Sequence, residues 1–193
     1  REKYFQASTF DHPLGLFRSW NIPSDTDNPL FGHFEPSIPI DTRDLYEHGI
    51  SDIFRLFHPL FPIIDIQSFP LSPDIRETII QRLAIQNEQG IWLFKPELRT
   101  DRDIKKVFKE LKTISPEGER LQLALAKKIV LSHFESVCLI PNYTKSDLNE
   151  FYPRYAMTDS TVFKTLPERE AQILYKMFVD FYYRTNINLW HEN

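Results

Sequence analysis

The residues that could take part in chemistry gather in the first 23 positions of this 193-residue chain. Residues 3–10 predict a short buried strand that leads into Asp11 and His12, and a turn at Gly15 and the aromatic-flanked Arg18 follow. In a parallel α/β architecture, a carboxylate at the carboxyl end of a strand points into the ligand crevice. The alternative is ordinary turn chemistry, because Asp and Gly both favour loop conformations. Spacing alone favours the turn.

Short sequence blocks that match a known family recur in order along the chain. The first block contains Asp11-His12, Leu14-Gly15, Phe17-Arg18, Trp20 and Ile22-Pro23. The later blocks are Gly32-His33-Phe34-Glu35-Pro36-Ser37-Ile38-Pro39, Phe151-Tyr152-Pro153-Arg154, Ser160-Thr161-Val162-Phe163, Asp180-Phe181-Tyr182-Tyr183 and Leu189-Trp190-His191-Glu192-Asn193. Together they resemble the 4-α-glucanotransferases (amylomaltases or disproportionating enzymes, glycoside hydrolase family 77), in particular the longer, cytosolic plant-type branch. The chain then corresponds to a fragment around the nucleophile strand.

The resemblance implies roles for four residues of the first block. Asp11 falls on the position that the family uses as nucleophile, so it is the expected catalytic residue. His12 is either a ligand of a sugar hydroxyl or a histidine satisfied by the backbone of a turn. Trp20, with Phe17, either stacks on a glucose ring or packs in the core. Arg18 either contacts substrate or pairs with a neighbouring acid.

Two departures from the family pattern bear on activity. Thr9 stands where the family has an Arg that keeps the nucleophile ionised and oriented, and Asn21 stands where it has a Glu. A retaining transfer also needs a second carboxylate as acid and base, and the family segments "G-E-D-L-G" and "T-H-D", which carry the acid/base Glu and the stabilising Asp, do not occur here. The chain alone is therefore expected to be inactive. Its start at Arg1 without Met indicates a fragment or a processed product.

The chain itself is predicted to be predominantly α-helical, with too few strands to close a barrel. The resemblance implies an α/β fold, namely a fragment of a (β/α)₈ barrel with a large helical insertion. Residues 1–40 would hold the nucleophile strand and a substrate-side loop. Residues 41–193 would hold mainly the insertion and the helix that leads toward the acid/base strand.

Periodicity and capping signals predict the individual elements. Short helices are expected at 41–49, capped by Asp41-Thr42, and at 51–56, capped by Ser51; strands are expected at 91–94 and 137–140. Longer helices are expected from Ser72, at 101–114, at 116–134 and from a capping box at Thr165 to Glu168. The expected apolar faces of the first three are, in turn, Ile75, Ile79 and Leu83; Ile104, Val107, Phe108 and Leu111; and Leu121, Leu125 and Ile129. Residues 19–40 are expected to form a long surface loop, and residues 59–70 a proline-broken connector.

Composition limits the classes of partner. The formal charge of −4 disfavours nucleic acid, and no apolar run is long enough to span a membrane. The single cysteine, Cys138, is expected to be a buried apolar residue. No metal-ligand or phosphate-loop spacing is present, so no metal or other cofactor is expected. The expected partner is an α-glucan or maltooligosaccharide in the cytoplasm, and the oligomeric state is left open. The alternative function is a non-catalytic relic domain that binds glucan or a protein.

Overall fold

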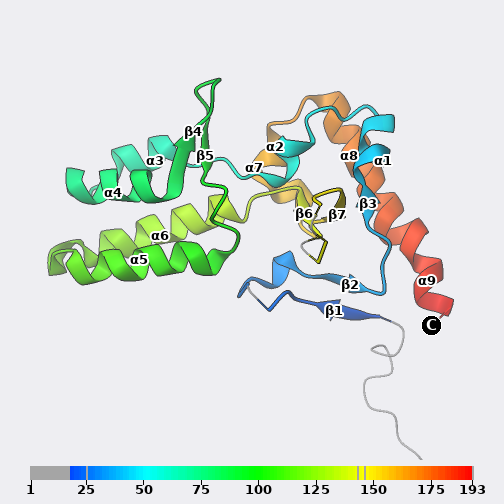
Figure 1. Ribbon diagram of the computed structural model, residues 1–193, viewed down its shortest axis with the longest axis horizontal. Helices are drawn as coiled ribbons and strands as arrows, with labels where there is room; N and C mark the ends of the chain where they lie inside the picture. Colours follow the sequence, from blue (N-terminus) through cyan, green and yellow to red (C-terminus); the bar gives the residue numbers. More distant parts are fainter. Residues whose placement is uncertain (1–17, 25, 143, 146, 193) are drawn as a thin grey trace, which may run out of the picture.

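The computed structural model describes residues 18–24, 26–142, 144–145 and 147–192 of the chain. The strand expected at residues 3–10 and the side chains of Asp11 and His12 lie outside these ranges. The described residues form a mixed α/β structure that is mostly helical, and no closed barrel is present among them (Figure 1). The prediction of a predominantly helical chain is confirmed. In the described residues, no helix is long and apolar enough to cross a membrane.

One hydrophobic core is built by the helices drawn from turquoise through green to yellow-green in Figure 1, α3 to α6. Its elements are α3 (Ile63–Ser68), α4 (Pro73–Leu83), α5 (Asp101–Ile114), α6 (Arg120–Phe134) and the hairpin of β4 (Ala84–Gln86) with β5 (Trp92–Phe94). The faces predicted for α4 and α5 are confirmed, because all their named apolar residues are buried. A capping box between Thr100 and Asp103 begins α5. Helices α5 and α6 run side by side as a hairpin joined by the 3₁₀ turn Glu117–Glu119.

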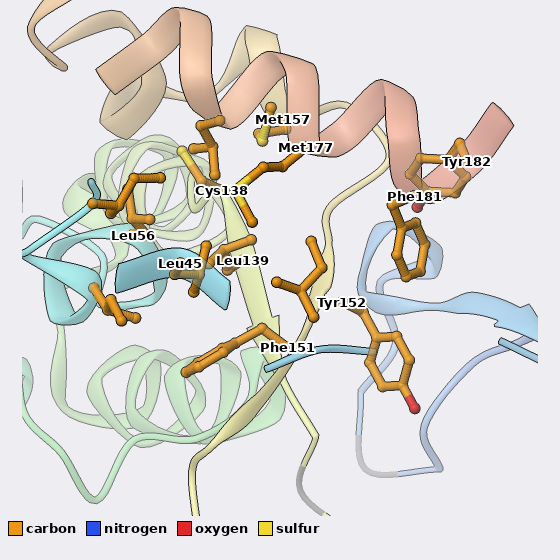
Figure 2. Packing of buried hydrophobic residues seen from close by; sticks show 14 of the residues in the cluster. Leu45, Leu56, Cys138, Leu139, Phe151, Tyr152, Met157, Met177, Phe181 and Tyr182 are labelled. Atoms are coloured by element: carbon orange, nitrogen blue, oxygen red, sulfur yellow. The ribbon is translucent and has the colours of Figure 1, made fainter. Parts of the chain in front are cut away.

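The second core lies around a three-stranded antiparallel sheet of order β3–β7–β6, formed by β3 (Ile40–Asp41), β6 (Leu139–Pro141) and β7 (Glu150–Pro153). The helices around it are α1 (Thr42–Glu47), α2 (Ile53–Phe57), α7 (Thr161–Lys164), α8 (Glu168–Asp180), a π-helical turn (Phe181–Thr185) and α9 (Asn186–Glu192). Figure 2 shows how Met177 of α8 and Met157 lie over Cys138 and Leu139. Cys138 is fully buried, as expected, and burial raises the pKa of its thiol to about 11.

Residues 19–40 are not an irregular loop, contrary to the prediction. They contain the antiparallel pair β1 (Ser19–Asn21) and β2 (His33–Glu35), joined through the 3₁₀ turn Pro29–Phe31. Strands of three residues are too short to show the two-residue alternation that identifies a strand in sequence. A close approach explains Gly32, because a Cβ there would lie 2.4 Å from Nε1 of Trp20.

Several other predictions need correction. Residues 59–70 contain the helix α3. The second short helix is capped by Asp52 rather than Ser51, and the capping box at Thr165 does not form, because its hydroxyl bonds to Val162 O at the end of α7. Helix α6 begins at residue 120, and its predicted face is wrong. Leu121 and Leu125 are 69% and 49% exposed, while the buried face is Leu123, Ala126, Val130 and Phe134.

Candidate functional site

Arg18 lies against two adjoining aromatic rings that come from distant parts of the chain. Its guanidinium carbon is 4.4 Å from the ring centre of Phe34 in β2 and 4.6 Å from that of Trp190 in α9. Such cation–π contacts stabilise a cation by about 0.5–1 kcal/mol at an exposed site. No acid among the described residues pairs with Arg18, so the structure gives it a third role that the sequence did not suggest. The two ring centres are themselves only 5.4 Å apart, so Phe34 and Trp190 form one continuous aromatic surface on which the guanidinium lies.

Trp20 packs against the same cluster from the neighbouring strand. Its ring meets Phe34 edge-on, with ring centres 4.8 Å apart, and Tyr155 at 6.0 Å. The indole Nε1 donates a hydrogen bond to Pro29 O at 3.0 Å, which fixes the ring across the hairpin. Trp20 is half-buried, so it partly packs as a core residue. Because Tyr155 is 56% exposed, the two rings nevertheless present aromatic surface at the edge of the cluster.

Helix α9 forms hydrogen bonds to residues 36–38, which follow β2. Trp190 Nε1 donates to Pro36 O at 2.6 Å, and Ile38 N donates to Oδ1 of the fully buried Asn186 at 2.7 Å. The Ser37 hydroxyl between these two anchors is buried and has no hydrogen-bond partner among the described residues. Residues 36–38 are thereby fixed beside the aromatic cluster formed by Arg18, Trp20, Phe34, Tyr155 and Trp190.

A pocket of about 350 Å³ opens on the other side of β2. The His33 ring is stacked on Tyr152 of β7, with ring centres 3.8 Å apart and an interplanar angle of 7°, and its Nε2 lies 2.7 Å from Oε1 of Glu35. Burial and then the charges of Glu35 and Glu150 raise the pKa of the Tyr152 phenol. Arg99 and Thr26 line the facing wall. Sequence reasoning missed this pocket, although His33 and Tyr152 both lie in blocks that carried the resemblance.

A wider hollow of about 740 Å³ lies between the two cores and is lined by neither Arg18 nor Trp20. Its walls include Phe54, Phe57 and His58, and burial lowers the pKa of the His58 imidazole, whose Nε2 contacts Phe94 O at 3.1 Å. Among the residues that the structure describes, no group of three His, Cys, Asp or Glu side chains is placed to hold a metal ion. The described part of the site therefore offers aromatic faces, one stacked cation and hydrogen-bonding groups, which suit binding of a polar ring.

Of the four site residues expected from the sequence, the structure brings Arg18 and Trp20 together on Phe34. It does not describe Asp11 or His12. The residues that sequence reasoning did not connect with Arg18 are Phe34 and Trp190, which lie in the second and last blocks of the resemblance. Arg18, Phe34 and Trp190 all lie in blocks that match the family, and this shared feature was the sequence signal that could have suggested a contact.

Comparison with known proteins supports the resemblance. The 4-alpha-glucanotransferase DPE2 of Oryza sativa subsp. japonica is 28% identical to this chain over 192 residues, which cover 99% of the chain. The chain spans only 20% of the length of that relative. No family model matches the chain, and no solved structure matches it. The chain is therefore a distant homologue, along almost its whole length, of one fifth of a plant 4-α-glucanotransferase.

Proposed function

We propose that this chain is the nucleophile-strand segment, with its helical insertion, of a 4-α-glucanotransferase that moves α-1,4-glucan segments between maltodextrin, starch or glycogen-like chains. The observation that carries the proposal is the 28% identity to a plant 4-α-glucanotransferase, which extends over 99% of the chain. Residues 1–40 would then hold the nucleophile strand of a (β/α)₈ barrel and the substrate-side loop that follows it. Residues 41–193 would form the insertion and the helix that precedes the next active-site strand.

The mechanism that fits is a retaining double displacement. Asp11 attacks the anomeric carbon and forms a glycosyl ester, while a carboxylic acid from outside this chain protonates the leaving oxygen. The same acid, now a base, deprotonates the hydroxyl of the acceptor chain, which displaces Asp11 and restores the α-linkage. Because that second carboxylate has no counterpart in the family blocks of this chain, residues 1–193 alone would bind glucan without transferring it.

The aromatic cluster around Arg18 supports a role in binding the glucan chain. Rings such as Trp20 and Tyr155 can lie against the apolar face of a glucose unit, and the N–H groups of the Arg18 guanidinium can donate to sugar hydroxyls. Phe34 and Trp190, whose ring centres are 5.4 Å apart, both contact that guanidinium and fix its position. His12, next to Asp11, would bind a hydroxyl of the unit under attack.

The test is transfer from maltotriose, followed as release of glucose. The full polypeptide encoded by the gene should be active, the 193-residue chain should be inactive, and Asp11→Asn in the full polypeptide should lower the rate by at least about 10³-fold, as expected for loss of a nucleophile. Asp44→Asn, an exposed aspartate in α1, is the matched control. Thr9→Arg should raise the rate, because a cation beside the carboxylate favours its ionised form.

A folded full polypeptide without transfer activity would refute the enzymatic proposal. It would leave the non-catalytic domain that binds glucan or a protein. If the Asp11→Asn variant is active, the protein still catalyses the transfer, but Asp11 is not its nucleophile.

A further inference from the structure

The outer face of the α5–α6 hairpin carries a groove of about 660 Å³. The two helices bury one face each against α4 and the β4–β5 hairpin, through residues such as Ile104 and Val130. The groove runs along the seam on a different face, where the helices lie side by side (Figure 1). In a helical bundle such a seam is the position that a third helix occupies.

Five cations line this groove: Lys105, Lys109, Lys112, Arg120 and Lys127. No carboxylate is among the residues that line it, although the chain as a whole has a formal charge of −4. The three lysines of α5 follow one another at intervals of four and three residues. They therefore form one stripe about 10 Å long, at a rise of 1.5 Å per residue.

Most of this charge is not neutralised inside the molecule. Lys105 bonds to the carboxylates of Asp101 and Asp27, and Arg120 has a long 3.5 Å contact with the exposed Glu117. Lys109, Lys112 and Lys127 have no acidic partner among the residues that the structure describes. Like charges this close repel one another, so an anionic occupant would relieve the repulsion.

The chemistry of the groove excludes a neutral glucan as its occupant. Sugar hydroxyls need acceptors as well as donors, and the polar side chains here are all cationic donors. The apolar floor is aliphatic at the surface, because Phe108 is only 3% exposed while Leu121 is 69% exposed. An occupant must therefore combine repeated negative charge with an aliphatic surface.

We propose that this groove docks an acidic amphipathic helix of a partner protein. Carboxylates on that helix would face the unneutralised Lys109 and Lys112 on one side and Lys127 on the other, and its leucine or alanine side chains would cover Leu121 and Ala124 between the charged rows. A phosphate cluster would match the charge but would leave the aliphatic surface exposed. The proposal does not depend on the proposed enzymatic function.

The neighbouring lysines provide matched controls. Lys106 follows Lys105, and Lys128 follows Lys127, but neither lines the groove. Lys109→Glu with Lys112→Glu reverses two groove charges on α5, and Lys106→Glu with Lys128→Glu reverses two charges outside the groove, one on α5 and one on α6. Both pairs change the net charge equally, so only the position differs. All four side chains are exposed, and circular dichroism checks that both variants fold.

The experiment measures the fluorescence anisotropy of a labelled, stapled helical peptide of about 15 residues, with glutamates at i, i+4, i+7 and i+11 beside a leucine row. We expect saturable binding that weakens about fivefold between roughly 0.05 and 0.3 M NaCl. The groove variant should weaken it at least about tenfold, and the control variant less than about twofold. The peptide with Gln in place of Glu should bind at least about tenfold more weakly.

Three results would overturn the proposal. The first is the absence of saturable binding to the glutamate peptide. The second is equal weakening by the groove and the control variants, which would indicate attraction by net charge alone. The third is tight binding of tripolyphosphate together with failure of the glutamate peptide, which would make the groove a phosphate site.

Discussion

Asp101 fastens the segment that follows β1 to the first turn of α5, and its replacement should release that segment. The carboxylate is 1% exposed and accepts hydrogen bonds from Thr26 Oγ1 at 2.8 Å, from the backbone N of Asp27 at 3.0 Å and from Nζ of Lys105 at 2.5 Å. Asp27 in turn pairs with Lys105 and with Arg102. The contacts that join Thr26 and Asp27 to the first turn of α5 thus include one buried carboxylate, and Arg102 adds a hydrogen bond to Ser24 O.

The expected loss of unfolding free energy can be estimated from the hydrogen-bond partners of Asp101. Hydrogen bonds to a charged group contribute about 1.5–3 kcal/mol each, and loss of one member of a buried ion pair costs about 3–5 kcal/mol. Lys105 is about one-third exposed, so it can regain water, and the lower end of the range applies. We expect Asp101→Ala to lower the free energy of unfolding by about 3 kcal/mol. Asp101→Asn, which retains two acceptor contacts, should lower it by about 2 kcal/mol.

The pH dependence gives an independent check. Burial, the largest effect, raises the pKa of the Asp101 carboxyl, but the hydrogen bonds from Lys105, Thr26 and Asp27 together more than offset it and leave the pKa lowered. The folded state therefore binds this proton less readily than the unfolded chain, whose Asp pKa is about 3.9. The stabilisation is fully present above that value and is lost as the pH falls through the lower folded-state pKa.

The assay is urea unfolding followed by tryptophan fluorescence, at several pH values between neutrality and acid. At neutral pH a loss of about 2 kcal/mol should move the midpoint by about 1 M urea, and the gap between wild type and Asp101→Asn should narrow in acid. Asp74→Asn is the control, because Asp74 is an exposed residue in the first turn of α4. An effect of Asp101→Asn no larger than that of the control, or a gap that persists unchanged in acid, would refute this reasoning.

Three further predictions concern the cores. Leu123→Ala should destabilise the chain by about 2–5 kcal/mol, because the side chain is 3% exposed, whereas Leu125→Ala should cost less than about 1 kcal/mol; urea unfolding that gives the reverse order would contradict the observed face of α6. Cys138 should react with iodoacetamide at pH 8 only after unfolding, since a pKa of about 11 rather than 9.0 lowers the thiolate fraction about a hundredfold; rapid labelling of the folded chain would show that the thiol is accessible. Tyr182→Phe removes the hydrogen bond from its hydroxyl to Pro153 O at 2.9 Å and should lower the unfolding free energy by about 1 kcal/mol; an unchanged denaturation midpoint would mean that this bond contributes nothing net.

The sequence predicts the buried face of a helix correctly where the apolar residues occupy one face only. In α5 the apolar residues Ile104, Val107, Phe108 and Leu111 are separated by charged residues, so only one face can be buried. Helix α6 has apolar residues on more than one face, and the contact with α5 decides between them. The predicted stripe through Leu121 was therefore a valid helical pattern on the wrong side of the helix.

The candidate site was harder to predict, because its contacts join residues that are far apart in the chain. The resemblance identified Arg18 and Trp20, but nothing local indicates that Arg18 stacks on Trp190 or that Ile38 bonds to Asn186, 148 residues away. The hairpin that presents these residues has strands of three residues, which periodicity cannot detect. Family blocks can thus identify residues that meet in space before any local rule can explain why they meet.

These long-range contacts give the helical part of the chain a direct role in shaping the segment 18–41. Asp101 holds that segment at Thr26, and Asn186 holds it at Ile38, so one anchor comes from each core. Thr26 lies in the loop that joins β1 to β2, and Ile38 follows β2, so the anchors fix the loop of the hairpin and the end of its second strand. Loss of Asp101 would free the loop of the hairpin, and loss of Asn186 would free the segment after β2, in both cases without changing a residue of the aromatic cluster itself. The geometry around Arg18 therefore depends on the packing of both cores, and destabilising either core should disturb the cluster before the rest of the chain unfolds.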